Sequence, residues 1–211
     1  MSTRRAGGEV TSTRVYIEEG RRWTFACALD WPGWCRRGRG EEEALASLLV
    51  YQERYAAVAG PEFRPGSWEV IGRVSGTATT DFGAPDAVGE WDRESLSSGE
   101  ARRLAGLLTA VWAALDAVVA GAPAELRKGP RGGGRDRDAI ADHVREAERS
   151  YGRKLGVAVP SGTPWAEHRQ MLVGALVNGD AQSAWPRRYA VRRLAWHVLD
   201  HAWEIEDRSG A

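Results

Sequence analysis

The sequence has only two cysteines, no net charge and no long uninterrupted apolar run. Cys27 and Cys35 are too few for a disulfide framework and lack the spacing of a zinc finger. Lys and Arg together number 29, as do Asp and Glu, so no net field favours nucleic acid or an anionic membrane. The N-terminus is polar, and no apolar run approaches the length of a membrane span. These absences predict a cytoplasmic protein with neither nucleic acid nor a membrane as its partner.

The rest of the composition is that of a globular protein. The 211 residues are 43% hydrophobic and 27% charged, which is enough to bury a core in one domain or in two small ones. Residues 14–29 predict a hairpin, because Phe25 and Cys27 belong to an alternating apolar series typical of a strand with one buried face. A thiol in such a core is predicted to be unreactive.

A small α+β unit is predicted over residues 14–75, after a flexible tail at residues 1–13. Apolar residues at helical spacing predict a helix over residues 41–58. Renewed alternation predicts a strand over residues 67–74. The order strand, strand, helix, strand gives a ββαβ unit.

This unit resembles the HicB-like antitoxin fold. A D-x-P-G-C segment, a glycine turn and an E-E-A-L helix start carry the resemblance. They stand here as Asp30-Trp31-Pro32-Gly33-Trp34-Cys35, which has one inserted residue, Gly38 and Glu42-Glu43-Ala44-Leu45. Members of the family usually carry a DNA-binding segment and neutralise a toxin, but no basic recognition helix follows the unit here. The resemblance therefore implies an alternative function: a non-catalytic stress, regulatory or antitoxin-like protein that binds a toxin-like partner.

Residues 76–95 are rich in Gly, Thr and Pro and are predicted to be a linker. A capping box of Ser97 and Glu100 then opens a helix that ends near residue 121. A second helix is predicted over residues 136–155.

Two further helices are predicted to begin at prolines. Thr163 is expected to be the N-cap of the third helix, with Pro164 at its first position, and Pro186 opens the fourth. Residues 96–211 are thus predicted to form an up-down-type four-helix bundle. The predicted fold class is a two-unit α+β chain, the ββαβ unit followed by this bundle.

Three of the four histidines occupy sequence positions from which they can bind one metal ion together. His197 and His201 are four residues apart, so a helix brings both imidazoles to one face. His143 lies on the apolar side of another predicted helix, which can face the first in a bundle core. Three imidazoles can hold a divalent metal and leave positions open for water or substrate. The alternative is a chance His pair in an amphipathic helix, and His168, which has no such partner, is predicted to lie outside the site.

Glu204, Glu146 and Arg193 are further candidates beside this site. Glu204 follows His197 by seven residues and Glu146 follows His143 by three, so either carboxylate can hold an imidazole proton or act as a base. Arg193 precedes His197 by four residues and can bind a substrate carboxylate. The alternative is that the two carboxylates lie on the solvated surface.

Residues 126–207 resemble the DinB-like metalloenzyme bundle. The motif H-x-x-x-x-E is present from His143 to Glu148, and the motif H-x-x-x-H is present from His197 to His201. The resemblance implies that the three histidines bind a divalent metal, zinc or nickel, and that a low-molecular-weight thiol is a cofactor or substrate. It further implies a metal-dependent transferase, isomerase or hydrolase with a small-molecule substrate. If the chain is such an enzyme, we expect the first unit to be an accessory lid or the dimerisation surface of a homodimer.

Overall fold

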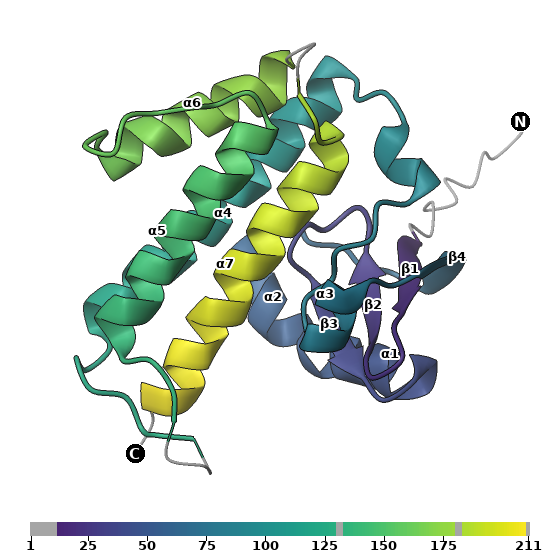
Figure 1. The fold of residues 1–211 in the computed structure, drawn as a ribbon. Coiled ribbons are helices and arrows are strands. Elements are labelled where there is room, and N and C mark those ends of the chain that lie inside the picture. Colours follow the sequence, from purple (N-terminus) through teal and green to yellow (C-terminus); the bar gives the residue numbers. More distant parts are fainter. Residues whose placement is uncertain (1–11, 130–132, 180–182, 210–211) are drawn as a thin grey trace, which may run out of the picture.

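The computed structural model describes residues 12–129, 133–179 and 183–209 (Figure 1). A four-stranded sheet in the N-terminal part of the chain lies beside a group of long helices. The last helix, α7 (Arg187–Ser209), runs between the sheet and the other long helices. The mixed α+β class is as predicted.

The strands of the sheet follow the order β3-β2-β1-β4. β1 (Thr13–Glu19) and β2 (Thr24–Ala28) pair antiparallel, which confirms the predicted hairpin. β4 (Trp68–Ser75) is the strand predicted near residues 67–74, and it pairs parallel with β1. β3 (Cys35–Gly38) pairs antiparallel with β2 and was not expected, because a strand of four residues is too short for alternation to be visible.

The helix predicted over residues 41–58 is two helices, α1 (Glu41–Val50) and α2 (Gln52–Ala59), which are separated at Tyr51. α1 packs on β2 and β3. Leu48 of α1 is fully buried, and its carbonyl accepts a hydrogen bond from a tryptophan indole of the turn before β3 at 2.9 Å. α1 therefore covers one face of the sheet.

Both faces of β2 are buried, whereas its alternating pattern predicted one buried face. Ala26 and Ala28 belong to the same core cluster as α1. On the opposite face, Phe25 packs against Trp196 of α7 with ring centroids 6.1 Å apart, and Cys27 belongs to the same apolar cluster. The prediction was wrong because small alanines were counted as the exposed side of the strand, although close packing against a helix requires small residues.

Residues 76–95, which were predicted to be a linker, are folded. They contain α3 (Ala78–Phe82) and a 3-10 helix, η1 (Glu90–Arg93). The buried carboxylate of Glu18 on β1 accepts a hydrogen bond from the Thr80 hydroxyl at 2.5 Å. A Gly, Thr and Pro composition indicates irregular backbone, but it does not tell whether that backbone is packed.

A buried ion pair joins η1 to α7. Arg192 donates from Nε to Oδ1 of Asp92 at 2.9 Å and from Nη2 to Oδ2 at 2.5 Å, and it also donates to the Tyr16 hydroxyl on β1. The Asp92 side chain is 0% exposed and that of Arg192 is 8% exposed. One core cluster contains Ile17 of the sheet and Leu199 of α7. The division of the chain into two separable units stays a prediction.

The helices of the C-terminal part begin and end close to the predicted residues. They are α4 (Ser98–Gly121), α5 (Arg137–Lys154) and α6 (Trp165–Asn178), followed by α7. The capping box is confirmed: Ser97 Oγ accepts from the Glu100 N–H at 3.2 Å, and the Glu100 carboxylate accepts from the Ser97 N–H at 3.0 Å.

The start of α6 differs from the prediction by one residue. Pro164 is the N-cap, and the N–H of Thr163 donates to the carbonyl of Pro160 at 3.1 Å. Thr163 therefore belongs to the preceding turn and not to the helix. Pro186 likewise precedes α7 and does not occupy its first position: its carbonyl accepts from the Ala190 N–H at 2.9 Å, and α7 begins at Arg187.

An up-down four-helix bundle is not confirmed. α4, α5 and α7 lie side by side, whereas α6 lies across one end of them (Figure 1). α6 buries a short stripe that includes Leu172 and Leu176, and it packs mainly on α4. Apolar periodicity predicts that a helix is packed, but it does not predict the direction in which it crosses its neighbours.

By length and composition alone, α4 is apolar enough to span a membrane, with a mean hydropathy of 1.8 over its most apolar window. This differs from the expectation that no run approaches that length. Leu104, Leu108 and Leu115 of α4 are buried in the core cluster, and 33% of the window is buried. A core helix passes the same test, and α4 packs on α7, α6, α5 and α2.

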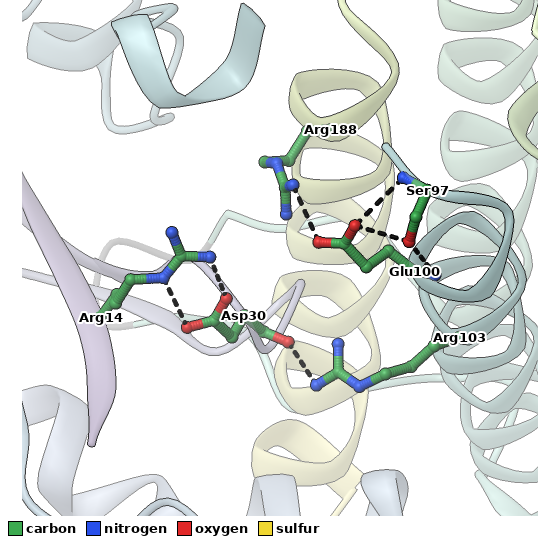
Figure 2. Close-up of polar contacts among 6 residues, drawn as sticks. All are labelled: Arg14, Asp30, Ser97, Glu100, Arg103 and Arg188. Carbon is green, nitrogen blue, oxygen red and sulfur yellow. Dashed lines mark hydrogen bonds and ion pairs between the residues drawn. The ribbon is translucent and has the colours of Figure 1, made fainter. Parts of the chain in front are cut away.

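Polar contacts join the loop after β2 to α4, and the beginning of α4 to the beginning of α7 (Figure 2). Arg14 of β1 donates to the Asp30 carboxylate at 2.6 Å, and Arg103 of α4 donates to the Asp30 carbonyl at 2.8 Å. The Glu100 carboxylate of the capping box also accepts from Arg188 of α7 at 3.4 Å. These contacts help to position the sheet against the helix that carries two of the candidate metal ligands.

Candidate metal centre

α5 and α7 bring His143, His197 and His201 together. The ring centroids are 5.1 Å apart for His143 and His197, 5.0 Å for His143 and His201, and 4.7 Å for the two histidines of α7. One ligand nitrogen of each imidazole lies within 4.8 Å of the other two. Nitrogens on one tetrahedral zinc ion lie about 3.3 Å apart, so small side-chain rotations suffice to complete such a site. The three histidines are close enough to hold one metal ion.

Burial lowers the pKa of two of these imidazoles, those of His143 and His197. The pKa of His197, which is 7% exposed, lies well below the ordinary value because burial disfavours the charged ring, and the charges of His201 and Arg193 add to this effect. The pKa of His143 is lowered by burial and then by His201 and Arg135. A neutral imidazole has a free lone pair and can bind a metal without first losing a proton.

Glu204 contacts the cluster through His201. Its carboxylate lies 2.9 Å from His201 Nδ1 and also accepts from Arg208 at 2.7 Å. The pKa of Glu204 is lowered, first by the hydrogen bond with His201. An ionised carboxylate at Nδ1 makes this nitrogen the proton-bearing one and leaves Nε2 of His201 as the ligand atom. Glu204 thus occupies the place predicted for a residue that holds an imidazole proton.

The donor set fits a divalent metal. His197 Nδ1 is buried and has no hydrogen-bond partner among the residues that the structure describes. A buried polar atom without a partner is unfavourable unless another group binds there. Imidazole nitrogens are ligands that suit zinc, copper, iron and nickel.

The other two candidates differ in their surroundings. Glu146 is exposed, which agrees with the surface alternative. The Arg193 side chain is 8% exposed, and its Nε and Nη1 have no hydrogen-bond partner within the described ranges. The nearest carboxylate oxygen, Oδ1 of Asp86, is 4.0 Å from Nε. Arg193 therefore has donors available beside the histidine cluster.

Tyr151, which was not among the predicted site residues, lies beside the histidine cluster. Its ring centroid is 5.7 Å from that of His197, and the guanidinium of Arg193 lies 5.2 Å from the same ring. Tyr151 lies about two turns beyond His143 on α5. The sequence could have identified Tyr151, because it shares one face of α5 with His143, and an aromatic residue near a metal site can contact a bound molecule.

His168 and Glu148 lie outside the cluster. His168 is fully buried, and a Cβ on Gly152 of α5 would come within 3.0 Å of its Nε2. Glu148 ends the H-x-x-x-x-E motif, but its carboxylate accepts from the Trp112 indole of α4 at 2.7 Å. Five residues turn a helix by about 500°, so Glu148 faces away from His143. The prediction that His168 is not a ligand agrees with its position.

Comparison of the chain with protein-family models, with curated proteins and with solved structures finds no match. The class of molecule is therefore defined by the fold and the site alone. It is a mixed α+β protein in which three histidines from α5 and α7 converge.

Proposed function

We propose that this chain is an enzyme that depends on a divalent metal and acts on a small molecule, with His143, His197 and His201 as the metal ligands. The observation that carries the proposal is the convergence of three imidazoles, two of which have a lowered pKa. Zinc and nickel are the metals we favour for this donor set. When bound, such a metal lowers the pKa of a water or thiol and polarises an electrophile.

The surrounding side chains have separate tasks in this proposal. Glu204 orients His201 through Nδ1. Arg193 binds an anionic group of the substrate, because a buried guanidinium with unpartnered donors is unfavourable unless an anion pairs with it. The Tyr151 ring, which contacts both Arg193 and His197, places that anionic group beside the metal ligands.

The DinB-like resemblance narrows the proposed reaction to thiol-dependent transfer or isomerisation. Cys27 and Cys35 are buried on the sheet face that packs against Trp196. In this proposal neither is the nucleophile, and a low-molecular-weight thiol supplies the sulfur. In this proposal the first unit is an accessory lid or a dimerisation surface.

One zinc or nickel ion is expected to bind per chain. Replacing His197 with alanine is expected to lower the affinity by more than about 100-fold, because one of three ligands is lost. The measurement is anaerobic purification with elemental analysis, followed by calorimetric titration of the metal-free protein.

Two variants serve as controls for this titration. His168→Leu removes a buried histidine outside the cluster and is expected to leave the stoichiometry unchanged. Glu204→Gln is expected to lower the affinity by about 10- to 100-fold, because it removes only the carboxylate that orients His201. Full metal retention in a His143→Ala/His201→Ala double variant contradicts the assignment. If the chain binds no metal, the alternative function, that of a non-catalytic binding protein, is favoured.

The proposed reaction is tested with thiols of the mycothiol and bacillithiol types against activated alkenes and alkyl halides. Metal-loaded protein is expected to accelerate thiol transfer, because the thiol is deprotonated and held beside its electrophile. Equal rates for the wild type, the His197→Ala variant and the metal-stripped protein would exclude thiol transfer as the function. Hydrolysis of a small molecule would then be tested in its place.

A further inference from the structure

Cys27 and Cys35 lie directly opposite each other on the adjacent antiparallel strands β2 and β3. Their sulfur atoms are 2.6 Å apart, and both side chains are buried and free. The sequence contains only these two cysteines, so each has a single intramolecular candidate for a disulfide bond. Neither residue has a task in the proposed metal chemistry.

The backbone of this pair suits a cross-strand disulfide. The Ala28 N–H donates to the Trp34 carbonyl at 3.0 Å, so the next pair along the ladder is hydrogen-bonded. Cys27 and Cys35 therefore form a pair that is not hydrogen-bonded, and the Cys35 N–H donates instead to the Gly33 carbonyl at 2.9 Å. The Cα atoms of such pairs are about 4.5 Å apart, which lies within the disulfide range of about 4.4 to 6.8 Å. The bond can form without a change in strand pairing.

A small cavity beside α7 limits which reagents can reach the sulfurs. Its volume is about 10 Å³, and both cysteines line it together with Arg192, Arg193 and Trp196. This is about the space that one water molecule requires. Hydrogen peroxide is close to this size, whereas a disulfide of two peptide thiols is much larger. The cavity therefore selects a small oxidant.

We propose that hydrogen peroxide converts Cys27 and Cys35 into an intramolecular disulfide. Peroxide oxidises one thiol to a sulfenic acid and leaves as water. The second thiol attacks the sulfenic sulfur, the S–S bond forms and a second water leaves. The protein loses two hydrogen atoms, and peroxide accepts two electrons. Burial raises the pKa of the Cys35 thiol, so the pair reacts more slowly than an exposed thiolate.

The test uses the full folded chain treated with hydrogen peroxide at neutral pH. After quenching and denaturation without reductant, both thiols are expected to be lost to alkylation, and the intact mass is expected to fall by two hydrogens. A peptide map is expected to contain Cys27 linked to Cys35. The thermal midpoint is expected to rise by about 5 to 10 °C, because the bond closes a short loop in the unfolded chain.

Oxidised glutathione is the control oxidant, added so that it can accept as many electrons as the hydrogen peroxide. It is expected to leave the folded chain reduced and to oxidise the pair only after unfolding. In a Cys35→Ala variant, peroxide is expected to leave a sulfenic acid at Cys27, which dimedone traps when the chain is denatured in its presence. Two intact thiols after peroxide, oxygen addition without a cross-link, or disulfide-linked dimers would each overturn the proposal in the wild-type chain itself. Rapid oxidation of the folded chain by oxidised glutathione would overturn the limit set by the cavity.

Discussion

An Asp92→Ala variant is expected to be about 3 to 5 kcal/mol less stable than the wild type, which is the usual effect of removing one partner of a buried ion pair. Asp92 is fully buried, and its carboxylate accepts two hydrogen bonds from Arg192. Without it, the guanidinium remains in the core beside the Tyr16 hydroxyl and has lost the carboxylate that pairs with it. The measurement is guanidinium chloride unfolding followed by the far-UV circular dichroism signal of the helices.

The matched control is Asp207→Ala. Asp207 pairs with Arg54 at 2.9 Å, but the two side chains are 56% and 31% exposed. An exposed pair of this kind contributes less than about 1 kcal/mol. A loss of similar size in both variants would contradict the view that η1 is part of the core. It would support the original interpretation of residues 76–95 as a linker.

Glu148 is expected to make the protein less stable as pH rises. Burial raises the pKa of its carboxyl from 4.5 to about 8, and the charge of Arg169 offsets part of this effect. Between these two pH values the folded state holds a proton that the unfolded state has released. The free energy of unfolding therefore falls with rising pH by up to about 1.4 kcal/mol per pH unit from this group, and the effect levels off above pH 8.

A Glu148→Gln variant is expected to lack this decline. Glutamine keeps an oxygen that can accept the hydrogen bond from the Trp112 indole, which Glu148 accepts at 2.7 Å. The variant should gain stability relative to the wild type from about pH 5 to pH 8. Glu167→Gln, at an exposed position of α6, is the control and should leave the pH profile unchanged. Parallel profiles for Glu148→Gln and the wild type would show that this carboxyl is ionised in the folded protein.

Structural features that depend on residues within one helix were predictable from the sequence. The Ser97 and Glu100 capping box depends on residues three apart, and the helix formed where the pattern predicted. The three histidines converge because each lies at or near the buried side of its own helix, and α5 packs on α7. No crossing angle or strand pairing was needed for that inference.

Contacts between residues far apart in the chain were not predictable in the same way. Asp92 and Arg192 are 100 positions apart, and no local pattern marks either as the partner of the other. β3 was missed because it is short, and the second buried face of β2 was missed because alanine gives a weak apolar signal. The Glu148 side chain points toward Trp112 of α4, which follows from helix geometry only once the packing of α4 against α5 is known.

The position of α7 in the chain has a consequence for folding during synthesis. α7 follows all the other described elements, yet it covers Phe25 on the sheet and packs along α4 and α5. The ribosome therefore synthesises the segments of the sheet and of three long helices before α7, the helix that covers them. During that interval their apolar faces stay exposed to other chains, because α7 follows them in the sequence. We expect the nascent polypeptide to depend on chaperones until α7 emerges.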